Sequence, residues 1–153
     1  MPLSNGNSEE SLDLNQLRLK WIDKLYSIAS KLGLTQKKEV VTNGGRVDLV
    51  WYHTFESDLP NIGLELPLVG FEIEASWRTR KHIKGDIFNL LELSPALGII
   101  LFLRKGFEDE ADLRGNVEAA KKYTRGYSGL SRIAVWTDNE VDEIYARMLG
   151  GQT

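Results

Sequence analysis

The sequence predicts an α/β protein in which helices flank a mixed sheet, with the element order α-β-β-β-α-β-α-β-α. The first observation is that several segments repeat an apolar residue every three or four positions, as the buried face of a helix does. The second is that helices separate the strand-like segments late in the chain, which implies right-handed parallel crossovers. The third is an early pair of strand-like segments around a glycine-containing turn, which predicts an antiparallel hairpin.

The chain has 153 residues, which suits one domain with a single core, because domains most often hold about 100 to 150 residues. We expect residues 11–150 to form this domain and the small, polar residues 1–10 to be a disordered tail. The sequence has no apolar run of the roughly 20 residues that a membrane span needs, and no signal-peptide pattern. We therefore expect a cytoplasmic protein with no membrane partner.

The composition narrows the chemistry. The absence of cysteine excludes thiol catalysis and thiolate metal sites, and two isolated histidines argue against a His-rich metal site, so we expect any metal to be bound through oxygen. The sequence also lacks a phosphate-binding loop, a dinucleotide-binding glycine motif and a nucleophile elbow. The 22 acidic and 19 basic residues give a net charge of -3, which argues weakly against a nucleic-acid partner, although local patches matter more than the sum.

The first half of the chain is predicted to hold one helix and three strands. Residues 14–32 carry the clearest helical period, and Gly33 is placed to end that helix. Residues 39–42 and 46–53 are strand-like and flank the turn Asn43-Gly44-Gly45. After a loop, a third strand is expected over residues 68–75.

The second half alternates helices and strands. Residues 80–93 are predicted to form a helix, because their apolar residues fall on one face, and Ser94-Pro95 is expected to terminate it. Residues 98–103 are continuously apolar, which is typical of a strand covered on both faces. The remaining elements are a helix over 112–123, a buried strand over 132–137 and a final helix over 139–149, capped by Asp138 or Asn139.

Three carboxylates lie inside predicted strands: Asp48, Glu72 and Glu74. A buried carboxylate is costly unless it is paired, hydrogen-bonded or bound to a metal. Glu72 and Glu74 point to the same face because they are two residues apart, and a neighbouring strand would bring Asp48 alongside. Such an oxygen cage suits Mg²⁺ or Mn²⁺. The alternative is that the acids lie on the solvent face of an edge strand, paired with lysine or arginine.

A basic stretch follows these carboxylates directly and contains Arg78, Arg80, Lys81 and Lys84. A metal-binding carboxylate pair beside cations is the combination that phosphodiester cleavage needs, because cations contact the backbone phosphates while the metal polarises the scissile one. The alternative is a solvated basic face that balances the acids. Trp77, in the same stretch, would either stack on a base or fill the core.

The element order, with Asp48 after the hairpin turn and Glu72-Ile73-Glu74 in the next strand, resembles the PD-(D/E)XK nuclease superfamily, which includes restriction endonucleases and archaeal Holliday-junction resolvases. The resemblance covers residues 11–137. It implies a restriction endonuclease-like αβββαβ core with a C-terminal αβα extension. It also implies Mg²⁺ or Mn²⁺ bound by Asp48, Glu72 and the backbone carbonyl of Ile73. Homodimers are common among such nucleases, because two strands need two cuts.

One residue departs from the family pattern: Glu74 stands where the superfamily usually has lysine. Some restriction enzymes of the superfamily carry Glu-x-Glu, and other members supply the lysine from the following helix, where this chain offers Lys81 and Lys84. A third interpretation is a degenerate relative that does not cleave. Many members also place a glutamate on the first helix near the metals. The candidates in this chain are Glu9, Glu10 and Asp13.

We therefore expect a metal-dependent deoxyribonuclease. Asp48 and Glu72 would hold the metal, and Glu74 would orient or activate the attacking water. The residues expected to contact DNA are Arg78, Arg80, Lys81 and Lys84, of which Lys81 or Lys84 would also stabilise the phosphate charge. The alternatives are a catalytically inactive nucleic-acid-binding or protein-interaction module with the same fold, and an α/β scaffold whose acids are merely solvated.

Overall fold

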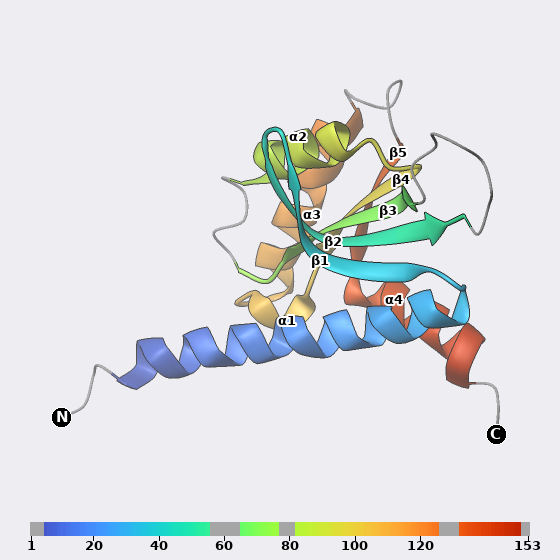
Figure 1. The fold of residues 1–153 in the computed structure, drawn as a ribbon. Helices are drawn as coiled ribbons and strands as arrows, with labels where there is room; N and C mark the ends of the chain where they lie inside the picture. The colour runs from blue at the N-terminus through green and yellow to red at the C-terminus, as the bar shows by residue number, and fades with distance from the viewer. Residues whose placement is uncertain (1–4, 56–64, 77–81, 126–131, 151–153) are drawn as a thin grey trace.

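Five strands form one mixed sheet in the order β1-β2-β3-β4-β5, in a computed structural model that describes residues 5–55, 65–76, 82–125 and 132–150. The first three strands pair antiparallel and the last three pair parallel (Figure 1). This arrangement confirms the predicted antiparallel hairpin and the parallel crossovers. The strands are β1 (Thr35–Thr42), β2 (Gly45–Thr54), β3 (Glu65–Glu74), β4 (Leu97–Phe102) and β5 (Arg132–Thr137).

Four α-helices cover the two faces of the sheet and confirm the predicted α/β class. Figure 1 shows α1 and α4 on one face and α2 and α3 on the other. None of the helices in the described part of the chain has the length and apolar character needed to cross a membrane. The helices are α1 (Asn5–Lys31), α2 (Ile83–Leu93), α3 (Glu110–Thr124) and α4 (Asp138–Tyr145), with two short helical turns, η2 (Arg104–Gly106) and η4 (Ala146–Gly150).

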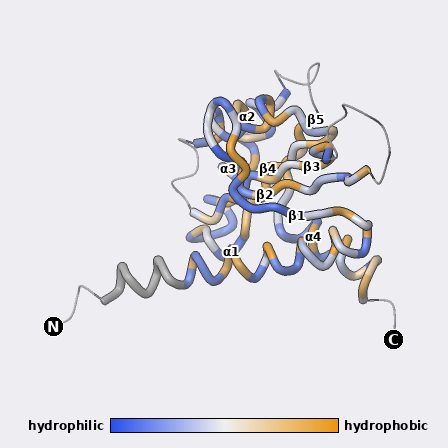
Figure 2. Tube along the Cα trace, in the orientation of Figure 1, coloured by the Kyte–Doolittle hydropathy of each residue, from blue (hydrophilic) through white to orange (hydrophobic). Residues whose placement is uncertain are grey.

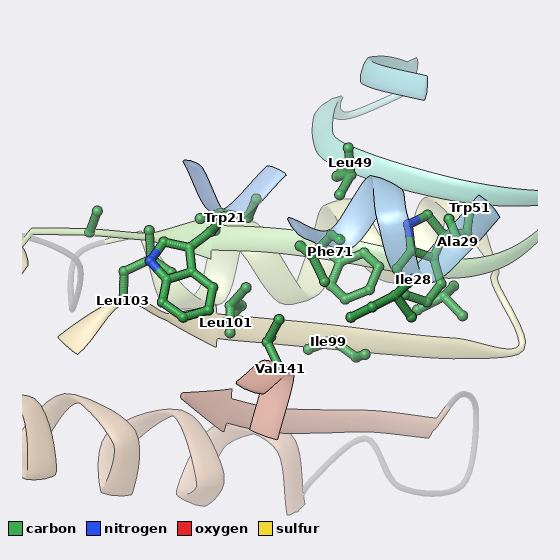
Figure 3. Close-up of a cluster of buried hydrophobic side chains, with 14 residues drawn as sticks. Trp21, Ile28, Ala29, Leu49, Trp51, Phe71, Ile99, Leu101, Leu103 and Val141 are labelled. Carbon is green, nitrogen blue, oxygen red and sulfur yellow. The ribbon is translucent and has the colours of Figure 1, made fainter. Parts of the chain in front are cut away.

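The core on the α1 side is centred on Phe71 of β3. Its ring meets Trp51 of β2 edge-on at 4.7 Å and Trp136 of β5 at 6.4 Å between ring centroids. Figure 3 shows Trp21 and Ile28 of α1 lying against these strands. Hydrophobic and hydrophilic residues alternate along α1 in Figure 2, so this helix buries one face and exposes the other, as its apolar period predicts.

A second core fills the space between the sheet and α2. Ile83, Ile87 and Leu90 of α2 are buried against Ile100 and Phe102 of β4. The β4 strand is therefore covered on both faces, which confirms the interpretation of its continuous apolar run. The helix is capped at its C-terminus by Ser94, which lies directly before Pro95. The φ of Ser94 is 55°, the left-handed conformation that commonly terminates helices.

Several boundaries differ from the predictions. Helix α1 begins at Asn5 rather than near Ser11, and α2 begins at Ile83 rather than at residue 80. Strand β1 begins at Thr35 rather than at residue 39. Its first four residues, Thr-Gln-Lys-Lys, were not predicted as strand because they are polar; the strand lies at the edge of the sheet, where polar residues are tolerated. Strand β5 is half-buried and not fully buried, since it forms the opposite edge and has a neighbour on one side only.

The N-cap of α4 is Thr137, one residue before the predicted cap. Its side chain accepts a hydrogen bond from the backbone N–H of Asn139 at 3.3 Å. In return, Glu140 Oε2 accepts from the Thr137 backbone N–H at 2.8 Å, which completes a capping box. The sequence signal was present, because a threonine followed three residues later by glutamate is the usual pattern of such a box.

We expect Thr137→Ala to lower the free energy of unfolding by about 1 kcal/mol, because the substitution removes the acceptor for a helix N-terminal N–H group. The melting temperature should fall by about 2–4 °C in a chain of this size. Thr124→Ala is the matched control, since the Thr124 hydroxyl donates to a carbonyl at the end of α3 and caps no N–H group. Equal melting temperatures for the two variants would contradict the capping assignment.

Candidate functional site: a carboxylate cluster between β2, β3 and α2

The site begins where strands β2 and β3 separate. Their regular pairing extends as far as Leu49 and Phe71. Two residues further along β3, the backbone N–H of Ile73 points to the same side as that of Phe71, as alternate residues of a strand do. It donates to Oδ2 of Asp48 at 2.7 Å. The Asp48 side chain thus takes the place of a strand partner and fixes its own position against β3.

Glu72 and Glu74 project from β3 towards α2, as the alternation of the strand predicts. Gly70, on the same face, packs directly beneath Leu90 of α2, where an added Cβ would lie 3.0 Å from a leucine methyl group. Both glutamates are buried, with 3% and 9% of their surfaces exposed. Asp86 of α2 is 7% exposed and interacts with both of them.

Asp48, Glu72, Glu74 and Asp86 are called the carboxylate cluster below. Glu72 shows its electrostatics most directly. The pKa of Glu72 is raised to about 10, mainly by burial and then by the charge of Asp48, a hydrogen bond with Asp48 and the charge of Glu74, whereas a hydrogen bond with Asn89 lowers it. Glu72 therefore holds a proton at neutral pH and can donate it to Asp48.

Asp86 repeats this arrangement from the opposite side. Burial raises the pKa of Asp86 to about 11, followed by a hydrogen bond with Glu74 and the charges of Glu74, Glu72 and Asp48. The protonated Asp86 can thus donate to Glu74. The cluster consists of two hydrogen-bonded carboxyl pairs, one joining β2 to β3 and one joining β3 to α2.

Asp86 and Asn89, both on α2, are not among the site residues predicted from the sequence. A signal for Asp86 was present in the sequence. Ile83, Ile87 and Leu90 define the buried stripe of this helix, and Asp86 lies on the same stripe, three residues after Ile83 and four before Leu90. An acid on the buried face of a helix calls for a partner in the same way as an acid in a buried strand.

Two oxygens of the cluster are unusual. Among the described residues, Glu72 Oε1 and Asp86 Oδ2 are buried and have no hydrogen-bond partner. Buried oxygens are normally satisfied, and carboxylate oxygens are the ligands that Mg²⁺ and Mn²⁺ prefer, so the donor chemistry fits a hard divalent cation. In the side-chain conformations of the described residues, however, no three His, Asp or Glu side chains form a group that could hold a metal ion. The cluster thus suits a divalent cation in the type and burial of its oxygen atoms, and not in the present arrangement of its side chains.

The structure describes three of the other predicted site residues. Ile73 lies beside Asp48 through its backbone N–H. Lys84 is exposed on α2, and its ammonium group lies 5.2 Å from the ring centroid of Tyr123 on α3. Asp13 is exposed on α1. The predicted residues that lie outside the described part of the chain are Trp77, Arg78, Arg80 and Lys81, together with the side chains of Glu9 and Glu10.

No protein-family model matches this chain, and no curated protein or solved structure matches it significantly.

Proposed function

We propose that this chain is a metal-dependent nuclease that hydrolyses DNA phosphodiester bonds, of the kind that the PD-(D/E)XK resemblance implies. The single observation that carries the proposal is the carboxylate cluster at the point where β2 and β3 separate, in which the half-buried Asp48 meets the buried Glu72, Glu74 and Asp86. Asp48 of β2 and Glu72 and Glu74 of β3 are the residues that the resemblance assigns to the site, and they interact with one another. The element order of the structure is also the order that the resemblance requires.

Asp48 and Glu72, with the backbone carbonyl of Ile73, would hold Mg²⁺ or Mn²⁺. When bound, the cation would supply Lewis-acid polarisation of the scissile phosphate. Asp48 is suited to this role because its hydrogen bond with the Ile73 N–H holds its carboxylate in place. Glu72 contributes a buried oxygen that has no hydrogen-bond partner among the described residues.

Glu74 would orient the attacking water and accept its proton, in place of the lysine that the superfamily usually has. Asp86 would act as a positioning residue, because its hydrogen bond with Glu74 fixes the orientation of that carboxylate. The basic stretch of residues 78–84 would contact the phosphate backbone. Lys84 is its described cation and is exposed.

The test is a cleavage assay with purified protein, in which linear, supercoiled, branched and single-stranded DNA are incubated with Mg²⁺, Mn²⁺ or EDTA. We expect cleavage that depends on the divalent cation. Asp48→Asn should reduce the cleavage rate at least 100-fold, because the loss of a metal ligand costs more than the 10–100-fold of an outer-shell partner. Asparagine keeps an oxygen for the Ile73 N–H, so the fold should persist.

Asp23→Asn is the matched control, since Asp23 is exposed on α1. It should cleave at the wild-type rate. Cleavage by Asp48→Asn at the wild-type rate, or no cleavage of any DNA form with either cation, would reject the nuclease assignment.

A second candidate is a nucleic-acid-binding or protein-interaction module that does not cleave. It is favoured by Glu74 in place of lysine and by the lack of a metal-holding group of three side chains among the described residues. In that case wild type and Asp48→Asn would bind DNA equally without cutting it. Charge reversal of Arg78, Arg80 and Lys81 would weaken the binding.

A further inference from the structure

An open cavity of about 820 Å³ lies at the carboxyl ends of strands β4 and β5. Its walls come from α1, from η2, and from the first turns of α3 and α4. Figure 1 shows α1 running past the sheet close to the start of α4. No member of the carboxylate cluster lines this cavity. Ligands of open α/β sheets bind outside the carboxyl ends of the parallel strands, and cavities of this volume accommodate small ligands.

One wall of the cavity is apolar and includes Trp21, Phe107, Leu113 and Val117. Trp21 is 5% exposed, and its indole N–H is buried without a hydrogen-bond partner among the described residues. In Figure 3 the indole nitrogen points towards Leu103, which is followed directly by two residues that line the cavity. Leu103 itself is fully buried and does not line the cavity, so this N–H is directed into the core and the wall offers a ligand apolar surface alone.

Cations surround this wall, and two of them have partners within the protein. The Arg104 Nε atom lies 2.5 Å from Oδ1 of the buried Asp138. The Lys24 ammonium lies 2.5 Å from Asp142, which Arg104 also approaches at 3.8 Å. These pairs neutralise two of the acids that line the cavity.

Three further cations line the cavity: Lys20, Lys105 and Arg114. Within the described residues, none of the three takes part in an ion pair, and all are exposed. Of the two other acids at the cavity, Asp109 is engaged as the N-cap of α3, accepting from the Asp112 N–H at 2.7 Å. Asp109 keeps its negative charge as a cap, so Asp109 and Glu110 oppose the three cations, and the charged side chains of the lining sum to +1, which favours an anion.

The helix ends act in the same direction. Helices α3 and α4 both begin at this cavity, and the positive ends of their dipoles favour negative charge there. The cavity thus combines an apolar wall with three exposed cations and a net positive lining.

We propose that this cavity binds a nucleotide, either free or as the 5′-phosphorylated end of a nucleic acid strand. The base would lie against the apolar wall formed by Phe107, Leu113 and Val117. The phosphate would lie among Lys20, Lys105 and Arg114. Small-ligand sites typically pair apolar walls with a few charged or polar groups, and a base with its phosphate has this combination of an apolar and a charged part. This inference does not depend on the proposed nuclease activity, because it involves none of the carboxylate cluster.

The test is isothermal titration calorimetry in EDTA with four probes: adenosine 5′-monophosphate, adenosine, inorganic phosphate, and a 5′-phosphorylated dinucleotide. We expect adenosine 5′-monophosphate to bind at least tenfold more tightly than adenosine or phosphate alone. Tighter binding of the dinucleotide than of the mononucleotide would support a strand end as the ligand, and the reverse would support a free nucleotide. Equal affinity for adenosine 5′-monophosphate and either of its parts would overturn the proposal.

Lys20→Glu/Arg114→Glu should weaken the binding of adenosine 5′-monophosphate at least tenfold, and Lys105→Glu should weaken it independently. These side chains are exposed, so the variants should keep the wild-type melting temperature. Lys38→Glu, an exposed lysine on β1 away from the cavity, is the matched control and should bind as wild type does. Asp48→Asn should also bind normally, which separates this test from that of the nuclease. Equal weakening in Lys38→Glu, or none in the cavity variants, would refute the site.

Discussion

Glu72→Gln is expected to stabilise the metal-free protein at pH 8 and to flatten the dependence of its stability on pH. Glutamate at this position is buried beside Asp48 and Glu74, and its pKa in the folded chain is about 10, against an ordinary value of 4.5. Glutamine is neutral at every pH and can donate to Asp48 as the protonated glutamate does. The substitution therefore removes the cost of protonating this side chain on folding.

The sign follows from proton binding. Between pH 4.5 and about 10, Glu72 is protonated in the folded chain and ionised in the unfolded chain, so folding takes up a proton. The raised pKa of Glu72 thus leaves the free energy of unfolding unchanged below pH 4.5 and lowers it by a growing amount as the pH rises towards 10. At pH 8 the variant should be more stable by over 1 kcal/mol, about 2–4 °C in melting temperature, because each pKa unit corresponds to about 1.4 kcal/mol.

Thermal unfolding at pH 5 and pH 8 in EDTA measures this effect. The gain of Glu72→Gln over wild type should be clearly larger at pH 8 than at pH 5. Glu92→Gln is the matched control, because Glu92 lies exposed on α2, and it should follow the wild-type profile. A Glu72→Gln variant that is less stable than wild type at pH 8 would show that the ionised carboxylate is stabilised in the fold.

Gly106→Ala is expected to cause the largest loss of stability among these substitutions, over about 2 kcal/mol. A Cβ at position 106 would overlap the backbone carbonyl of Ala75 and lie 2.7 Å from its Cα. Backbone atoms cannot rotate away as a side chain can, so η2 and the end of β3 would have to move apart. Urea unfolding measures the loss.

Gly85→Ala is the matched control. It lies in α2, where an added Cβ would have no neighbouring atom of the described residues within 4 Å beyond its own stretch of helix, and alanine favours helix, so the variant should gain about 0.5–1 kcal/mol. The contact at Gly106 also adjoins the carboxylate cluster, because the Leu103 N–H donates to the Glu74 carbonyl at 2.8 Å nearby. An unchanged free energy of unfolding for Gly106→Ala would mean that this close approach is absent in solution.

The elements with strong periodicity could be predicted from the sequence. The apolar stripe of α1 and the continuous apolar run of β4 each reflect burial, which leaves a direct pattern in the residues. The polar start of β1 left no such pattern, because an edge strand is held by its backbone pairing with β2. Glu39, with a φ of 50°, further interrupts its alternation.

The site could be predicted only in part. Asp48, Glu72 and Glu74 were detectable because each is an acid among strand-forming apolar residues. That Asp86 joins them depends on how α2 crosses the sheet, which is a property of tertiary packing. The cavity at the carboxyl ends of β4 and β5 could not be predicted for the same reason, since its residues come from separate elements and none belongs to a recognisable motif.

The edge strand β1 has a consequence for self-association. An exposed edge offers unpaired backbone groups to a second chain and can seed aggregation, especially when it is flat and apolar. Here the edge carries Lys37 and Lys38 in succession, followed by the left-handed Glu39, which breaks the regular backbone. Charge and distortion both oppose the docking of another strand. The polar residues that made β1 hard to predict from the sequence thus also oppose edge-to-edge pairing of β1 with the sheet of a second copy.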